Sequence, residues 1–215
     1  MRQPDTVGHF GFSMKPLDFY FDFSSPYGYL AAEQIEALAA RTGRQVTWRP
    51  ILLGAVFKIT GAAPLTTSPL KSDYALKDFR RSAAYYGVPY RAPSHFPIVT
   101  VQAARATLWA REHAPERYKA LALAFFRAYF REDRDLSQAE VVAEVLGREG
   151  FDAQAVLAAC GEEAVKAALR TEVDAAIARG VFGSPFFIAE DGEPFWGADR
   201  LPMLEAWLTR GGWAY

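Results

Sequence analysis

Aromatic and polar residues alternate at the start of the stretch 17–30, and a helical pattern follows them. Such alternation predicts a β-strand that is buried on at least one face. Ser24, Ser25 and Pro26 then interrupt the pattern. A proline suits the first helical turn because its missing N–H would have no partner there, and a serine oxygen can accept from a free amide at the same place. The sequence therefore predicts a strand that leads into a helix capped by Ser24 or Ser25.

The next elements extend this start into a strand–helix–strand unit. An amphipathic helix is predicted over residues 29–44, ending near Gly43, and a second strand over residues 45–50. So short a unit favours two parallel strands joined by a right-handed crossover.

Most of the remaining chain is predicted to be helical until a sheet resumes near the end. After a short helix at 51–56 and a loop, the predicted helices cover 71–86, 101–113, 115–130, 138–149, 152–159 and 162–179. An aromatic strand that ends at Ala189, a tight turn at 190–193 and a strand at 194–197 form a predicted hairpin. Asp199 is the expected N-cap of a closing helix over 199–210.

The order of these elements indicates an α/β fold, a thioredoxin-like domain with an inserted all-helical domain. The thioredoxin-like parts are predicted at residues 14–62 and 172–215, and the insertion at 63–171. Residues 1–13 are expected to form a disordered extension.

Composition narrows the classes of function. The 215 residues are 51% hydrophobic, which is enough for a substantial core, and the net charge of -1 gives no reason to expect nucleic acid or an anionic membrane as a partner. The three histidines lack metal-ligand spacing. Cys160, the single cysteine, excludes an internal disulfide and is expected to pack as a small apolar residue. The absence of a membrane-length apolar window and of an apolar signal core predicts a cytoplasmic protein.

Several blocks, in order along nearly the whole chain, resemble the 2-hydroxychromene-2-carboxylate isomerases. These enzymes and the kappa-class glutathione transferases belong to the DsbA-like branch of the thioredoxin superfamily. The matching blocks are residues 19–30 (FYFDFSSPYGYL), 48–51 with 54–58, 71–89, 180–185 (GVFGSP) and 195–200 (FWGADR). Each block alone is a weak signal, whereas their shared order is specific.

The resemblance implies a glutathione-dependent isomerase with Ser25 as its catalytic residue. Thioredoxin-like proteins open the first helix with a Cys-x-x-Cys pair, and the matching residues here are 25–28, SPYG, which exclude dithiol chemistry. The Ser25 hydroxyl is expected to donate to the glutathione thiolate and to lower the pKa of that thiol. The thiolate would add to a ring-opened, conjugated keto acid from aromatic degradation, permit rotation about the new single bond, and leave.

The same resemblance implies the other contacts and the assembly. Ser184-Pro185 matches a cis-proline turn, where the Ser184 backbone would pair with the cysteinyl amide of glutathione as an added strand. Ala198 and Asp199 match the place that holds the γ-glutamyl end. The implied glutathione-binding residues are Ser25, Pro26, Tyr27, Ser184, Pro185, Ala198 and Asp199. A homodimer is also implied.

Substrate contacts are less well defined. Lys58 and Lys71 are candidates to hold a carboxylate, and an aromatic wall is expected from Trp196, Tyr20, Tyr27 and Phe182. The chain departs from its relatives at Ala62, Ala63 and Val99, which stand where the relatives often carry polar residues. These changes remove hydrogen-bond donors from the expected pocket.

Other functions remain open at this stage. The same fold hosts kappa-class-like glutathione transferases and peroxidases, and a DsbA-like module without catalytic activity is a third hypothesis. Each candidate residue also has a purely structural interpretation. Ser25 and Asp199 are favoured helix caps in any protein, Pro185 suits an edge strand in the trans form, and exposed lysines are commonly solvated.

Overall fold

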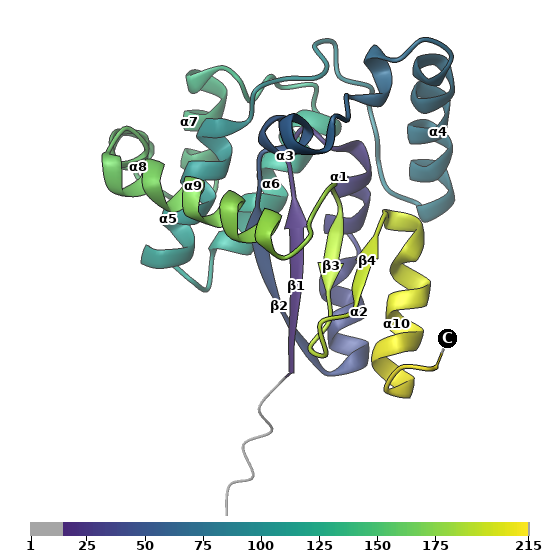
Figure 1. Cartoon of the computed structure of the whole chain (residues 1–215). Coiled ribbons are helices and arrows are strands. Elements are labelled where there is room, and N and C mark those ends of the chain that lie inside the picture. Colours follow the sequence, from purple (N-terminus) through teal and green to yellow (C-terminus); the bar gives the residue numbers. More distant parts are fainter. Residues whose placement is uncertain (1–14, 215) are drawn as a thin grey trace, which may run out of the picture.

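The computed structural model describes residues 15–214, so the predicted extension at 1–13 lies outside the described residues (Figure 1). A mixed four-stranded sheet of order β2-β1-β3-β4 joins the two ends of the described chain. Its strands are β1 (Lys15–Phe21), β2 (Arg44–Pro50), β3 (Phe186–Ile188) and β4 (Pro194–Trp196). β1 and β2 are parallel, whereas β3 is antiparallel to both β1 and β4. The predicted parallel unit and hairpin are therefore confirmed.

In the described part of the chain, two helices connect β1 to β2, seven lie between β2 and β3 in the sequence, and one follows β4. They are α1 (Pro26–Ala32), α2 (Ile35–Thr42), α3 (Leu53–Thr60), α4 (Lys71–Tyr86), α5 (Val101–His113), α6 (Tyr118–Phe130), α7 (Ala139–Arg148), α8 (Ala153–Cys160), α9 (Glu163–Ala178) and α10 (Leu201–Arg210). Two short 3-10 turns are η1 (Leu65–Thr67) and η2 (Ala198–Arg200). The thioredoxin-like fold class is thus confirmed, while the bounds of the helical insertion stay a prediction. No helix in the described range 15–214 is long and apolar enough to cross a membrane.

The single helix expected over 29–44 is wrong, because the chain breaks it into α1 and α2. The side chain of Gln34 donates from Nε2 to the backbone carbonyl of Leu30 at 2.7 Å, while its own N–H bonds to Ala31 at 3.0 Å. A side-chain amide has therefore taken a carbonyl that the helix backbone would use. α2 ends, as expected, at Gly43, whose φ of 66° is the left-handed conformation that glycine adopts easily.

Two other predicted ends differ from the structure. The short helix placed at 51–56 extends to Thr60 as α3, where Gly61 ends it. Asp199 is not the cap of the closing helix, because α10 begins at Leu201 and its N-cap, Arg200, makes no side-chain capping bond. Asp199 instead lies inside the 3-10 turn η2, so its carboxylate is not committed to a helix end.

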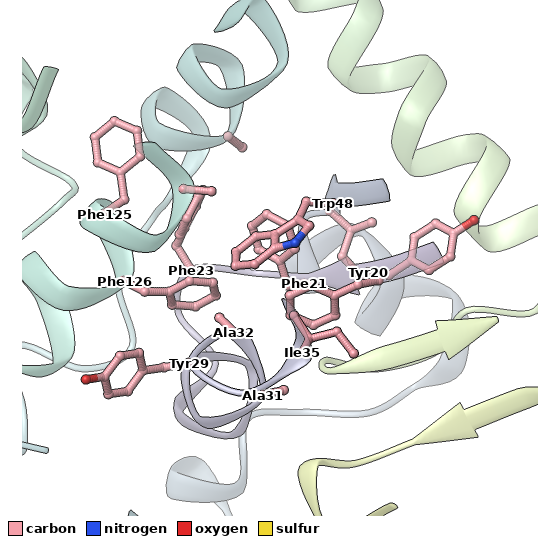
Figure 2. Packing of buried hydrophobic residues seen from close by; sticks show 14 of the residues in the cluster. Tyr20, Phe21, Phe23, Tyr29, Ala31, Ala32, Ile35, Trp48, Phe125 and Phe126 are labelled. Atoms are coloured by element: carbon pink, nitrogen blue, oxygen red, sulfur yellow. The ribbon is translucent and has the colours of Figure 1, made fainter. Parts of the chain in front are cut away.

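The alternation along β1 separates two different faces. Phe19, Phe21 and Phe23 are fully buried, and Figure 2 shows this side packed with Trp48 and with Phe126 of α6. Ring centroids lie 5.1 Å apart between Phe19 and Trp48 and 4.9 Å apart between Phe23 and Phe126. Such contacts add to the free energy gained by burying the rings. They fix the end of β1 against the helical segment.

Tyr20 lies on the other face of β1, and no described ring contact joins it to Trp196 or Phe182, so its place in the aromatic wall stays a prediction. Its ring points away from the phenylalanine cluster toward α9 (Figure 2), and its hydroxyl accepts from Arg179 just beyond that helix. The reason is the period of two along a strand, which sends neighbouring side chains to opposite faces.

An alternating chain of charges covers this second face and ties β1 and β2 to α5 and α9. Arg49 pairs with Asp18 at 2.7 Å and with Glu172 at 2.9 Å; Glu172 also pairs with Arg111 at 2.6 Å, and Asp18 with Arg179. These arginines line a cavity of about 440 Å³. Each of them already has a carboxylate partner, so the network is explained as a structural one.

Cys160 is fully buried at the end of α8, as predicted. Burial raises the pKa of its thiol to about 11. A thiol held in the protonated form is a poor nucleophile.

The network predicts a loss of stability on acidification. Burial opposes ionisation of Glu172, but hydrogen bonds and charge from Arg111 and Arg49 hold the pKa of Glu172 below its ordinary value. Its stabilising contribution is therefore complete above the pKa of an unfolded glutamate, about 4.3, and is lost as pH falls through the lower pKa of the folded state. We expect Glu172→Gln to lower the free energy of unfolding at pH 7 by about 2–3 kcal/mol, discounted because both arginines are partly exposed.

Urea denaturation of the wild type and the variant at several pH values measures this effect, and the difference between them should shrink as the pH falls below about 4. Glu163→Gln is the matched control on the same helix, because Glu163 and its partner Arg170 are largely exposed. An equal loss in both variants at pH 7 would contradict the assignment of Glu172 to a buried network.

Candidate functional site

Ser25 is the N-cap of α1, and its hydroxyl makes two hydrogen bonds. Oγ accepts from the N–H of Gly28 at 3.0 Å and donates to the carbonyl of Ser184 at 2.9 Å. The structure thus selects Ser25 rather than Ser24 as the cap. A cap needs only the first bond. The second one joins the end of β1 to a loop that lies far away in the sequence, so the cap interpretation alone leaves the arrangement unexplained.

The partner loop carries the cis peptide bond that the sequence predicted, between Ser184 and Pro185. The side chain of Ser184 accepts from the N–H of Asp22 at 3.0 Å, and the carbonyl of Pro185 accepts from the N–H of Gly197 at 3.1 Å. Within residues 15–214 the N–H of Ser184 has no hydrogen-bond partner. A free N–H beside a carbonyl is the pair of groups that an added peptide strand uses.

Asp22 is a buried acid beside Ser25 that the sequence patterns do not single out. Its carboxylate is 4% exposed and accepts from the N–H of Ser24 at 2.8 Å, the N–H of Leu53 at 2.7 Å and the hydroxyl of Thr100 at 2.9 Å. Burial raises the pKa of Asp22, while these donors act in the opposite direction. The available signal was an acidic residue inside an aromatic stretch, directly before the two serines.

A third segment, η2, completes the arrangement beside α1. Ala198 is buried and its carbonyl accepts from the hydroxyl of Tyr86 at 3.4 Å, whereas the Asp199 carboxylate is exposed and pairs with Arg200 at 2.8 Å. Tyr27 donates to Asp78 on α4. Burial and that hydrogen bond raise the pKa of Tyr27, and the charge of Asp199 contributes to the same shift.

Trp196 covers the loop that carries the cis peptide bond. A Cβ at Gly183 would lie 2.3 Å from Nε1 of Trp196, so only glycine leaves room for the indole. The rings of Trp196 and Phe182 pack edge to face at 4.8 Å, and each keeps a large exposed surface. These two members of the predicted aromatic wall are thus neighbours beside Ser184.

The structure does not bring every predicted residue to this place. Lys58 on α3 and Lys71 at the start of α4 are exposed, and no described hydrogen bond or ion pair joins either to the group around Ser25. Ala62, Ala63 and Val99 are exposed as well. Hydrogen bonds join Ser25 to Gly28 and Ser184, and Pro185 to Gly197, the residue before Ala198. Tyr27 bonds to Asp78 and Asp199 to Arg200, so their place in a glutathione site, like that of Pro26 and Ala198, stays a prediction.

Known proteins share both the sequence and the fold. The sequence model of the family described as the DsbA-like thioredoxin domain matches residues 16–209 of this chain. A 2-hydroxychromene-2-carboxylate isomerase of Sphingobium xenophagum is 33% identical over 199 residues, covering 90% of this chain and 98% of that protein. Glutathione S-transferase kappa 1 of Rattus norvegicus is 28% identical over 208 residues, covering 92% of each.

Solved structures agree with these relatives. A 2-hydroxychromene-2-carboxylate isomerase structure has a TM-score of 0.82 at 29% identity, covering 91% of this chain and 95% of that one. The cytosolic disulfide reductase DsbM of Pseudomonas aeruginosa, solved with GSH, has a TM-score of 0.65 at 19% identity, covering 91% and 96%. At that identity the second likeness shows the fold alone.

The packing of Gly28 against Ser184 yields a test of this geometry. A Cβ at Gly28 would lie 2.8 Å from Ser184 Oγ and 3.1 Å from Ser25 Cβ. Alanine is otherwise better than glycine inside a helix by about 1 kcal/mol. We expect Gly28→Ala to lower the free energy of unfolding, because Ser184 must give up its bond to Asp22.

The double variant Gly28→Ala/Ser184→Ala removes the clash, so it should be at least as stable as Ser184→Ala alone. Chemical denaturation of the four proteins in this double-mutant cycle measures the coupling. Additive effects of the two substitutions would show that Gly28 and Ser184 are not in contact.

Proposed function

The chain belongs to the DsbA-like thioredoxin family and, within it, to the 2-hydroxychromene-2-carboxylate isomerases, and from that premise we propose that it isomerises such ring-opened aromatic intermediates with the help of glutathione. Members of this family are enzymes, and both its isomerase and its transferase relatives match most of this chain. The observation that carries the proposal is the bond from Ser25 Oγ to the carbonyl of Ser184. This bond supports the proposal because it joins a hydroxyl, at the position where thioredoxin-like proteins keep a reactive cysteine, to a loop whose backbone is suited to pair with a peptide.

The residues present fit a tripeptide thiol. The unpartnered N–H and the carbonyl of Ser184 are suited to the cysteinyl unit, because a peptide in extended form pairs with both groups. Asp199 offers a negative charge to the amino group of the γ-glutamyl end. Ala198 has no polar side chain, so at this position only the backbone N–H is available for the carboxylate.

The Ser25 hydroxyl can donate its single hydrogen bond to either of two acceptors. In the structure it donates to the Ser184 carbonyl. If a peptide N–H paired with that carbonyl, the Ser25 hydroxyl would be released to donate to a thiolate instead. A hydrogen bond to the thiolate favours the ionised form and lowers the pKa of the thiol. Glutathione, when bound, would supply a sulfur nucleophile for addition to a conjugated double bond and later elimination from it, with no net oxidation.

The proposed substrate site lies beside this edge. Trp196 and Phe182 present exposed rings next to Ser184 and are suited to an aromatic substrate. Lys58 and Lys71 are exposed cations on α3 and α4, and they are the proposed partners of the substrate carboxylate. We propose that the apolar residues Ala62, Ala63 and Val99 leave the substrate with few hydrogen-bond donors on their side.

Ser25→Ala tests the role of the hydroxyl. We expect turnover of 2-hydroxychromene-2-carboxylate to require glutathione and to fall roughly 100-fold in the variant, since one hydrogen bond to a developing charge is lost. Absorbance change of the substrate measures the rate. Ser82→Ala is the control, because the Ser82 side chain lies on α4 and makes no described hydrogen bond. Full activity in Ser25→Ala, or turnover without glutathione, would refute the proposal.

A kappa-class-like transferase or peroxidase is the second candidate, favoured by the 28% identity to the rat enzyme over 92% of both chains. The same Ser25 geometry would activate the thiol for conjugation. Conjugation of a dinitrohalobenzene or reduction of a hydroperoxide at rates above those with the chromene substrate would favour it.

We further propose a cytoplasmic homodimer, since the resemblance implies this assembly. Light scattering coupled to size exclusion should give about twice the chain mass of 23.9 kDa. A single species at the monomer mass would contradict the dimer without affecting the assignment of Ser25.

A further inference from the structure

Asp22 holds together the segments that meet at Ser25. Its backbone carbonyl accepts from the N–H of Ser25 at 2.9 Å, and its backbone N–H donates to the hydroxyl of Ser184 at 3.0 Å. Its side chain binds the N–H of Ser24, the N–H of Leu53 and the hydroxyl of Thr100. One residue therefore contacts the β1–α1 turn, the start of α3, the residue before α5 and the loop with the cis peptide bond.

Every partner of the carboxylate is a donor, and two of the three are backbone amides that cannot turn. A carboxylate with two acceptor oxygens satisfies all of them, whereas an amide of the same shape cannot. With asparagine in place of Asp22, one fixed N–H would face the amide NH₂ and be left buried without an acceptor. The position therefore demands an ionised acceptor for geometric reasons.

We propose that Asp22 is a positioning residue for the Ser25 hydroxyl, a role that rests on the proposed function. By binding the N–H of Ser24 and anchoring that turn to Leu53 and Thr100, the carboxylate fixes Oγ opposite the Ser184 carbonyl. It touches neither substrate nor thiol. Its effect reaches the chemistry only through Ser25.

The sign of one measurement distinguishes positioning from a direct effect of charge. A buried negative charge near a thiolate disfavours ionisation, so if Asp22 acted through space its neutralisation would lower the pKa of the bound thiol. If Asp22 acts by positioning Ser25, its loss weakens the bond from Oγ to sulfur and raises that pKa. The two effects are opposite.

The experiment titrates the ultraviolet thiolate absorbance of glutathione bound to the full-length protein. We expect Asp22→Asn to raise the pKa of the bound thiol by about one unit or more and to lower kcat at least about tenfold. Asp152→Asn is the matched control, because Asp152 caps α8 and asparagine caps equally well. Thr100→Val keeps the charge and removes one donor, and its pKa shift should be smaller and of the same sign as that of Asp22→Asn.

Two results overturn the proposal. A lower thiol pKa in Asp22→Asn would show a through-space charge effect. An unchanged pKa and kcat in a destabilised but folded variant would show a role in stability only.

If the wild-type protein binds no glutathione, the proposed function is refuted. Amide hydrogen exchange then tests separately whether Asp22 positions the turn that carries Ser25. Exchange at the N–H groups of Ser25 and Gly28 should be at least about tenfold faster in Asp22→Asn than in Asp152→Asn, because local opening is easier once the turn loses its anchor. Equal exchange rates in the two variants would overturn the positioning role on their own.

Discussion

The hydrogen bond between the Ser25 hydroxyl and the Ser184 carbonyl is the constraint around which the candidate site is built. It is formed across 159 residues of sequence, between the end of β1 and the loop before β3. Closing a loop of this length costs conformational entropy that a single hydrogen bond does not offset. Pairing of β1 with β3 in the sheet offsets that cost and brings the two segments together.

The two faces of β1 have different roles: one stabilises the strand, and the other positions charged side chains. The phenylalanine face packs against α6 and fixes the strand, while the polar face carries Asp18 into the arginine network and ends at Asp22. The requirements differ between the faces, because buried apolar rings need only dense packing whereas buried charges need every donor and acceptor satisfied. The arginine-lined cavity lies on the polar face, yet its arginines are paired, and the chemistry belongs to the strand end instead.

A hydroxyl in place of a cysteine changes what this fold can do. A dithiol can exchange with a disulfide and carry two electrons, whereas a serine hydroxyl cannot, so sulfur chemistry at this position must come with a ligand. The exposed Asp199 and the free N–H of Ser184 are groups that such a ligand would use. Their availability follows from the fold, because η2 and the loop with the cis peptide bond supply edges that no strand of the described chain covers.

Local patterns in the sequence determined most elements, including the capped start of α1, α4 with its stop at Gly87, and the hairpin of β3 and β4. These elements depend on side chains that are a few residues apart. The match of residues 25–28 to the Cys-x-x-Cys position of thioredoxin-like proteins is local in the same way. The break at Gln34 was also local, since Gln34 bonds to Leu30 four residues earlier, but no periodic pattern marks it. The tertiary structure alone decided the direction of Tyr20 and the groups that the Asp22 carboxylate binds. Each of these depends on a partner or a face that the linear sequence does not specify. The partners of the Asp22 carboxylate lie up to 78 residues away, and Ser184, which accepts from the Asp22 backbone N–H, lies 162 residues away. This is why a buried acid at the end of an aromatic stretch gave no sign of what it holds.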